Sequence, residues 1–200
     1  MGLAAASQRR FALVTNYRDF SLHKESANSR GHIPINYLDS HESPSSFLKT
    51  LNKDARHFNP FNLILGDKDG VWYYSNVEGK ARELSHGIYG LSNSFLDTSW
   101  PKLDKLKNSF QSTLQEEIID EDRLIKILLE TKKADQDQLP DTGIGIEWEH
   151  SLSSIFIQTP KYGTRSSHIL IDRGESGMSL IDYQHSATEQ CVSKKKTIIS

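Results

Sequence analysis

Short apolar runs separated by polar turns predict paired strands in several parts of the chain. The clearest pair is residues 61–66 and 71–76, which are rich in aromatic and branched side chains. Asp-Lys-Asp-Gly at residues 67–70 has the composition of a hairpin turn, so we expect an antiparallel β-hairpin here. The same kind of pattern predicts further strands at residues 11–16, 81–84, 88–91, 154–159, 168–173 and 178–184.

Three other segments repeat apolar residues every three or four positions, which predicts helices. Ser43 can cap a helix that has Pro44 at its first position and apolar residues on one face. Similar apolar stripes predict helices over residues 101–115 and 121–130.

Strands in adjacent hairpins, with two helices grouped between them, indicate an α+β fold with mainly antiparallel sheets packed with helices. A parallel sheet would instead require alternating strand and helix units. We interpret residues 1–184 as one domain and the polar residues 185–200 as a disordered tail. Residues 22–31 and 131–148 are polar, and we expect them to be exposed loops.

The charge balance narrows the choice of partners. With 24 basic and 26 acidic side chains, the chain lacks the excess of positive charge that is typical of nucleic-acid-binding proteins. No apolar run approaches the roughly 20 residues that a bilayer crossing requires, and the first six residues do not resemble a secretory signal. We therefore expect a cytoplasmic protein without a transmembrane segment, and the single cysteine, Cys191, agrees with a reducing compartment.

A resident metal has no support in the sequence. The eight histidines are scattered, without the spacing of metal ligands on one helix. Residues 67–70 superficially resemble a calcium loop, but no suitably placed glutamate follows, and a hairpin turn explains them.

Five short motifs, taken in order along the chain, indicate a protein family. They are Thr-Asn-Tyr-Arg at residues 15–18, Ser-Arg-Gly at 29–31, Phe-Asn-Leu-Ile-Leu-Gly-Asp at 61–67, Gly-Leu-Ser-Asn at 90–93 and Tyr-Gly-Thr-Arg-Ser-Ser at 162–167. No single motif is specific. The ordered set, however, resembles the NRDE family from about residue 10 to about residue 182.

The resemblance implies a sandwich similar to that of the N-terminal nucleophile hydrolases, in which two sheets lie between helical layers. Members of the family typically begin Met-Cys and carry an Asn-Arg-Asp-Glu motif, whereas this chain has Gly2 and lacks that motif. We therefore expect the family fold to be incomplete at the N-terminus, with a sheet edge left unpaired.

The same resemblance suggests which residues bind a ligand. Asn93 and Arg165 belong to matched motifs, and we predict that both face one cleft. An Asn amide can donate to an oxyanion, and an Arg can hold a carboxylate or phosphate with two parallel hydrogen bonds. The alternative is that Asn93 closes a turn and Arg165 pairs with a structural acid.

Haem is the cofactor that the resemblance suggests, since the family is linked to intracellular haem handling. A surface cleft with one axial ligand can be enough for transient haem binding. His86 and His168 border the matched motifs and are the candidate ligands. The alternative is that both are ordinary polar surface or turn residues.

Two functional hypotheses follow. The resemblance implies a cytoplasmic protein, associated with the Golgi or with mitochondria, that acts in Golgi organisation and protein secretion or handles haem or acyl lipids. Its partner would then be a small-molecule or lipid ligand. The alternative is an acyl-amide or acyl-ester hydrolase of the N-terminal nucleophile type, in which an N-terminal cysteine attacks and its own amino group acts as base. We expect that activity to be absent from this chain, because Gly2 replaces the cysteine.

We expect no amidase or thioesterase turnover from this chain, since Gly2 supplies no nucleophile and Cys191 lies far from every matched motif. Incubation with acyl-CoA and with N-acyl amino acids should release thiol and amine no faster than buffer alone. Turnover above that rate that disappears in Cys191→Ser contradicts the expectation.

Overall fold

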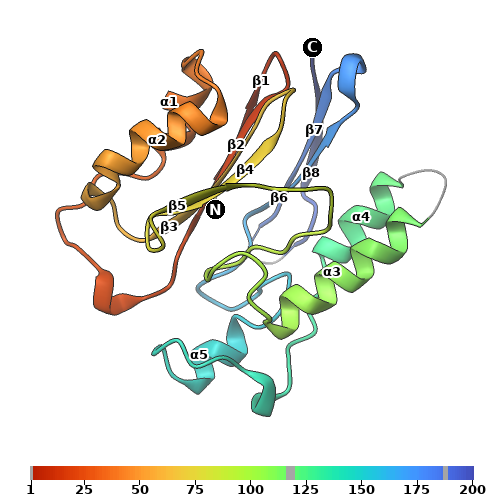
Figure 1. Ribbon diagram of the computed structural model, residues 1–200. Coiled ribbons are helices and arrows are strands. Elements are labelled where there is room, and N and C mark those ends of the chain that lie inside the picture. The colour runs from red at the N-terminus through yellow and green to blue at the C-terminus, as the bar shows by residue number, and fades with distance from the viewer. Residues whose placement is uncertain (1, 116–119, 187–188) are drawn as a thin grey trace.

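Two antiparallel sheets lie face to face between two pairs of helices in the computed structural model (Figure 1), which describes residues 2–115, 120–186 and 189–200. One pair of helices packs on the five-stranded sheet, and the other pair packs on the three-stranded sheet. This is the α+β fold that the sequence predicts, and its layers follow the order that the family resemblance implies.

The first sheet has the strand order β1-β2-β3-β4-β5, with every neighbouring pair antiparallel. Its strands are β1 (Gly2–Ala6), β2 (Arg10–Asn16), β3 (Phe61–Gly66), β4 (Val71–Ser75) and β5 (Lys80–Glu83). The expected hairpin is therefore confirmed as β3 and β4. Asp67 closes its turn, because its carboxylate accepts hydrogen bonds from the backbone N–H groups of Asp69 and Gly70.

Helices α1 (His32–Asp39) and α2 (Pro44–Asp54) cover the outer face of this sheet. The α2 prediction is confirmed, since Ser43 accepts a hydrogen bond from the Ser46 N–H and Pro44 stands at the start of the helix. Helix α1 is not predicted from the sequence, because this short and mixed segment lacks a clear apolar stripe. Ten fully or nearly buried residues form the core between these layers: Ala12, Val14, Ile33, Tyr37, Leu48, Ala55, Phe61, Leu63, Leu65 and Tyr74.

The second sheet has the order β6-β7-β8, and helices α3 (Pro101–Leu114) and α4 (Glu121–Leu128) flank it. Its strands are β6 (Ser166–Asp172), β7 (Met178–Gln184) and β8 (Ser193–Ile199). Leu124 and Ile125 of α4 pack on Ile169 and Ile181 of the sheet. The remaining helices are short: α5 (Ile146–Ser151) and 3-10 turns at Phe20–Leu22 (η1), Ala55–His57, Gln136–Gln138 and Gly174–Ser176.

The C-terminal residues differ from the disordered tail that the sequence suggests. Residues 193–199 form β8, which pairs with β7 along its whole length, while residues 187–188 of the expected tail lie outside the described residues. Two of its lysines contact neighbouring elements: Lys196 forms an ion pair with Glu121 (2.6 Å), and the Lys194 ammonium lies over the Tyr183 ring. Backbone pairing therefore orders a lysine-rich segment that hydropathy alone describes as loop.

Two expected strands are wrong. Residues 88–91 form a loop, because the Gly90 N–H donates to the Asp97 carboxylate and the Asp97 N–H donates to the Gly90 carbonyl, each over 2.8 Å. Residues 154–159 contain only an isolated bridge from Gln158 to Gly163. In both segments local hydrogen bonds to side chains replace a strand ladder.

Leu63→Ala should lower the free energy of unfolding by about 2–5 kcal/mol, because Leu63 on the central strand β3 is fully buried and its truncation leaves a cavity. Urea denaturation monitored by circular dichroism measures this loss. Ile35→Ala on α1 is the control, since Ile35 is 53% exposed, and its effect should stay within about 0.5 kcal/mol. Equal losses of unfolding free energy in the two variants would contradict the assignment of Leu63 to the core and of Ile35 to the surface.

Candidate functional site

A cleft of about 770 Å³ opens where β2 ends. Its walls come from segments that are distant in the sequence: the end of β2 and the loop after it, the loop before β3, the Gly-Leu-Ser-Asn loop, and the segment around α5. The lining residues are Asn16, Tyr17, Arg18, Asp19, Phe20, His23, Arg30, Asn59, Pro60, Asn93, Gly143, Ile144, Trp148, Leu152 and Tyr162. The volume falls in the range of small-molecule sites, roughly 300–1,000 Å³.

Hydrogen bonds join two of the sequence motifs at the floor of this cleft. The Thr15 hydroxyl donates to the Ser92 carbonyl (2.7 Å), and the Asn93 amide donates to the Asn16 carbonyl (3.0 Å). The Arg18 N–H in turn donates to the Asn93 carbonyl (2.7 Å). Asn93 therefore lines the cleft, as predicted, while its amide N–H₂ already holds the end of β2 in place.

A third motif supplies Arg30. One of its guanidinium N–H groups donates to the Pro60 carbonyl (2.8 Å), which also accepts the Tyr17 N–H. Burial lowers the pKa of Arg30 below its ordinary value, since a charged group is poorly solvated there. Among the described residues no carboxylate lies within ion-pair distance of Arg30, so its positive charge is available to a ligand.

Arg18 is tied to the opposite wall by a buried ion pair. Its guanidinium lies 3.3 Å from a Glu149 oxygen, and the two side chains are only 14% and 4% exposed. Thr142 completes the contact, because its N–H and hydroxyl both donate to the other Glu149 oxygen. The pair therefore fastens α5, which carries Glu149, to the loop after β2.

Lys102 lies beside this ion pair at the start of α3. Its ammonium donates to the Leu152 carbonyl (3.1 Å) and faces the Trp100 ring. Burial, together with the nearby charge of Arg18, lowers the pKa of Lys102 to about 8, and Glu149 opposes this shift only in part. Lys102 does not line the cleft itself, but at neutral pH it places a positive charge directly behind Leu152, which does.

The mouth of the cleft is aromatic. Phe20, Trp148 and Tyr162 line it, and each is more than half exposed. His23 is also exposed there, and none of the described residues is hydrogen-bonded to its ring. A ligand in the cleft would thus meet cationic groups on the floor and apolar rings at the entrance.

Arg165 lies elsewhere. It is exposed and lines a separate hollow of about 230 Å³ formed mainly by residues 156–165. Tyr162 belongs to both hollows, but the structure does not bring Arg165 and Asn93 into one cavity. The two residues thus line different hollows, and ligand binding by either of them stays a prediction.

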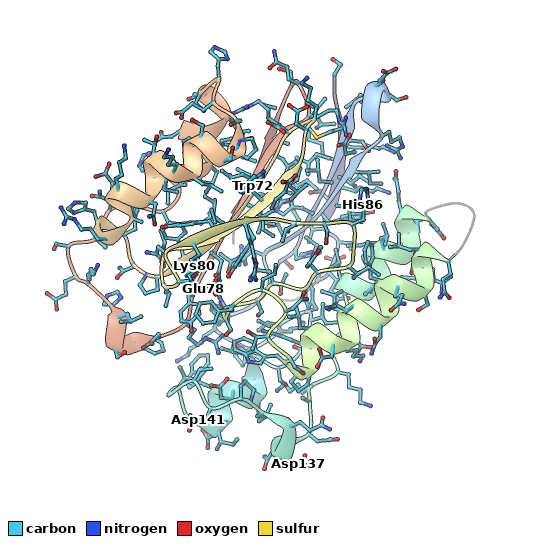
Figure 2. All side chains as sticks on the ribbon, in the orientation of Figure 1. Trp72, Glu78, Lys80, His86, Asp137 and Asp141 are labelled. Carbon is cyan, nitrogen blue, oxygen red and sulfur yellow. The ribbon has the colours of Figure 1, made fainter. Side chains whose placement is uncertain are left out.

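The two histidines proposed as haem ligands are also outside the cleft. His86 is exposed in the loop after β5, far from Asp141 at the α5 end (Figure 2). His168 has both ring nitrogens occupied, by the Ser166 hydroxyl (3.0 Å) and the Asp182 carboxylate (3.1 Å). His168 lines a hollow between the two sheets, but Ser166 does not line it. We therefore interpret Ser166, His168 and Asp182 as a structural hydrogen-bond network that links β6 to β7.

Arg18, Arg30 and His23 are the site residues that the sequence analysis did not select. Arg18 and Arg30 stand inside motifs that were noted, so the motifs themselves contained the signal. His23 lies in a polar loop without any pattern, and only the tertiary structure brings it to the cleft. Among the described residues no group of three or more His, Cys, Asp or Glu side chains is placed to hold a metal ion.

Comparison with known proteins identifies the family. The model of the family described as "Transport and Golgi organisation 2" matches residues 2–186. The chain belongs to this family. Four of the five motifs that predicted the relationship contribute lining residues to the cleft, and the fifth, on β3, is connected to the Gly-Leu-Ser-Asn loop through a hydrogen bond from the Asn62 amide to the Ser94 carbonyl.

Relatives within the transport and Golgi organisation 2 family are moderately similar to the chain. The transport and Golgi organization protein 2 homologs of Bos taurus, Homo sapiens and Mus musculus are 32%, 31% and 30% identical over 183 residues. These matches cover 84% of this chain and 66% of each relative, so the chain spans just under two thirds of the relatives' length. Within the described residues no helix is long and apolar enough to cross a membrane.

The stability that Lys102 contributes should rise with pH. Because its pKa is about 8 in the folded protein and 10.5 in an exposed lysine, the unfolded chain binds more protons at this position between those values. The free energy of unfolding of the wild type, relative to Lys102→Met, should therefore increase by up to about 3 kcal/mol from pH 8 to pH 10.5.

Urea denaturation of the two proteins across this pH range measures the difference. Lys68→Met is the matched control, since the Lys68 side chain is 71% exposed, and a pH dependence shared by both variants would not come from Lys102. If the difference in free energy of unfolding between the wild type and Lys102→Met does not change with pH, the Lys102 ammonium is well solvated in the folded protein.

Proposed function

We propose that the protein binds an amphipathic anion in the cleft, and that it does so within the family's role in Golgi organisation and protein secretion. Haem and acyl lipids with a phosphate head are the two ligands of this class that the family resemblance suggests. The observation that carries the proposal is the convergence of the family's motifs on one cleft that combines cationic and aromatic side chains.

The charges of the cleft favour an anionic head group. Arg30 directs a guanidinium without a carboxylate partner into the space, and Arg18 and Lys102 add positive charge behind it. A guanidinium can bind a carboxylate or phosphate through two hydrogen bonds, and partial burial strengthens that interaction. Glu149 offsets one of these charges through its pair with Arg18, and the carboxylate of Asp19, which also lines the cleft, is engaged in capping η1 through the Ser21 N–H.

The aromatic mouth favours a ligand with a large apolar part. Phe20, Trp148 and Tyr162 present rings that can stack on a porphyrin or cover an acyl chain. For haem, the residues present fit: the exposed ring of His23 would hold the iron, and Arg30 would pair with a propionate.

The hydrolase alternative receives no added support. Position 2 begins the edge strand β1, opposite Val14, and Gly2 has no side chain there. We therefore retain ligand binding without covalent catalysis as the proposed activity of this chain.

Arg30→Gln should weaken binding of both ligand types by about tenfold or more, since it removes a charge-assisted hydrogen bond worth about 1.5–3 kcal/mol. Absorbance titration with ferric haem and isothermal calorimetry with a long-chain acyl-CoA measure the two affinities. His23→Ala should weaken haem binding and change the Soret band of bound haem, while leaving acyl-CoA binding unchanged.

His86→Ala is the matched control, because His86 is exposed but lies outside the cleft (Figure 2). Wild-type affinities are expected for that variant. Binding of both ligands at wild-type strength in Arg30→Gln would refute the cleft as the binding site. Loss of haem binding in His86→Ala would instead indicate that His86, in the loop after β5, binds the iron.

A further inference from the structure

Exposed apolar side chains gather around the mouth of the cleft. The described residues include ten large apolar side chains that are exposed, and five of them lie in the three segments that surround this opening. These five are Phe20 (66% exposed), Leu22 (41%), Ile146 (55%), Trp148 (52%) and Tyr162 (55%), which we call the apolar rim. The other five are distributed over separate elements, at Ile35, Tyr89, Leu114, Val192 and Ile198.

The rim is held in position by the surrounding structure. Asp19 caps the turn η1, which carries Phe20 and Leu22, by accepting the Ser21 N–H. The buried pair of Arg18 and Glu149 fastens α5, which carries Ile146 and Trp148. A tight turn closed by hydrogen bonds between Thr159 and Tyr162 carries Tyr162. The apolar side chains are thus exposed on anchored backbone, and their exposure does not follow from a loose chain end.

Ligand binding in the cleft does not account for the whole rim. Phe20, Trp148 and Tyr162 line the cleft, but Leu22 and Ile146 do not. Exposing both of these aliphatic side chains to water is unfavourable, and such patches on soluble domains commonly mark an interaction surface. The composition, with Trp, Tyr and Phe beside Leu and Ile, is that of protein surfaces that lie at the boundary between lipid head groups and acyl chains.

The charges next to the rim are mixed in sign. Lys24 and Lys161 provide exposed cations, whereas Glu25, Asp141 and Glu147 provide exposed carboxylates. Figure 2 places Asp141 at this same end of the molecule, below the two sheets. A layer of zwitterionic head groups offers a phosphate for each cation and a choline for carboxylates and aromatic rings. A strongly anionic membrane would meet these carboxylates with repulsion.

We propose that the apolar rim docks the protein on a zwitterionic phospholipid surface, with the mouth of the cleft facing the lipid. The docking goes beyond the proposed function, since it requires neither haem nor an acyl ligand in the cleft. Its five side chains enter the head-group region while the two sheets remain in water, so the attachment is peripheral and reversible.

The test uses the full chain with vesicles of pure phosphatidylcholine. The double variant Leu22→Ser/Ile146→Ser removes the two rim residues that do not line the cleft. Its apparent affinity in a vesicle co-sedimentation assay should fall by about tenfold or more. The matched control Ile35→Ser/Val192→Ser removes two residues of similar exposure (53% and 55%) that lie elsewhere, and it should bind vesicles as the wild type does.

Tryptophan fluorescence gives a second readout. Of the three tryptophans, Trp148 is exposed, Trp72 on β4 is half-buried and Trp100 is buried, so vesicles should shift the wild-type emission to shorter wavelength, and Trp148→Phe should abolish that shift. Equal vesicle binding by the two double variants would overturn the proposal. So would binding that appears only when phosphatidylserine is added, or sedimentation equilibrium showing that the rim joins two copies of the chain.

The two proposals fail separately. Loss of vesicle binding in Leu22→Ser/Ile146→Ser, with wild-type haem and acyl-CoA affinity in Arg30→Gln, supports the docking surface alone. Loss of the soluble ligands in Arg30→Gln, with wild-type vesicle binding in Leu22→Ser/Ile146→Ser, supports the cleft alone.

Discussion

The alternation of side chains along β2 is the constraint on which both the core and the cleft depend. Ala12 and Val14 point to α1 and α2, while Leu13 points into the apolar space between the two sheets. A shift of one residue in the pairing with β3 would exchange these faces and bury the wrong set. Because the register is held in this way, the strand always ends with Asn16 at the floor of the cleft.

The buried pair of Arg18 and Glu149 extends that constraint beyond the sheet. It connects the loop after β2 to α5, two parts of the chain that are 131 positions apart. Removing one partner would leave an uncompensated charge in a poorly hydrated place, which is more costly than the pair itself is favourable. The same contact therefore shapes the wall of the cleft and holds Trp148 at its mouth.

The proposed ligand and the proposed membrane surface share a physical basis. Cations lie deep in the cleft, and apolar rings lie at its edge, so polarity decreases toward the opening. An amphipathic molecule taken from a lipid surface would enter with its charged end first and keep its apolar part close to the rim.

Short-range patterns in the chain were enough to predict the hairpin of β3 and β4, the capped start of α2 and the helices α3 and α4, because those signals lie within a few residues. They failed for α1 and for β8, where packing against the sheet or pairing with β7 overrides weak local preference. Both Asn93 and Arg165 stand in matched motifs, yet only the tertiary structure decides that Asn93 lines the cleft while Arg165 lines a separate hollow. The partnership of Arg18 with Glu149, and the arrival of His23 at the cleft, depend on contacts between distant segments that no local pattern encodes.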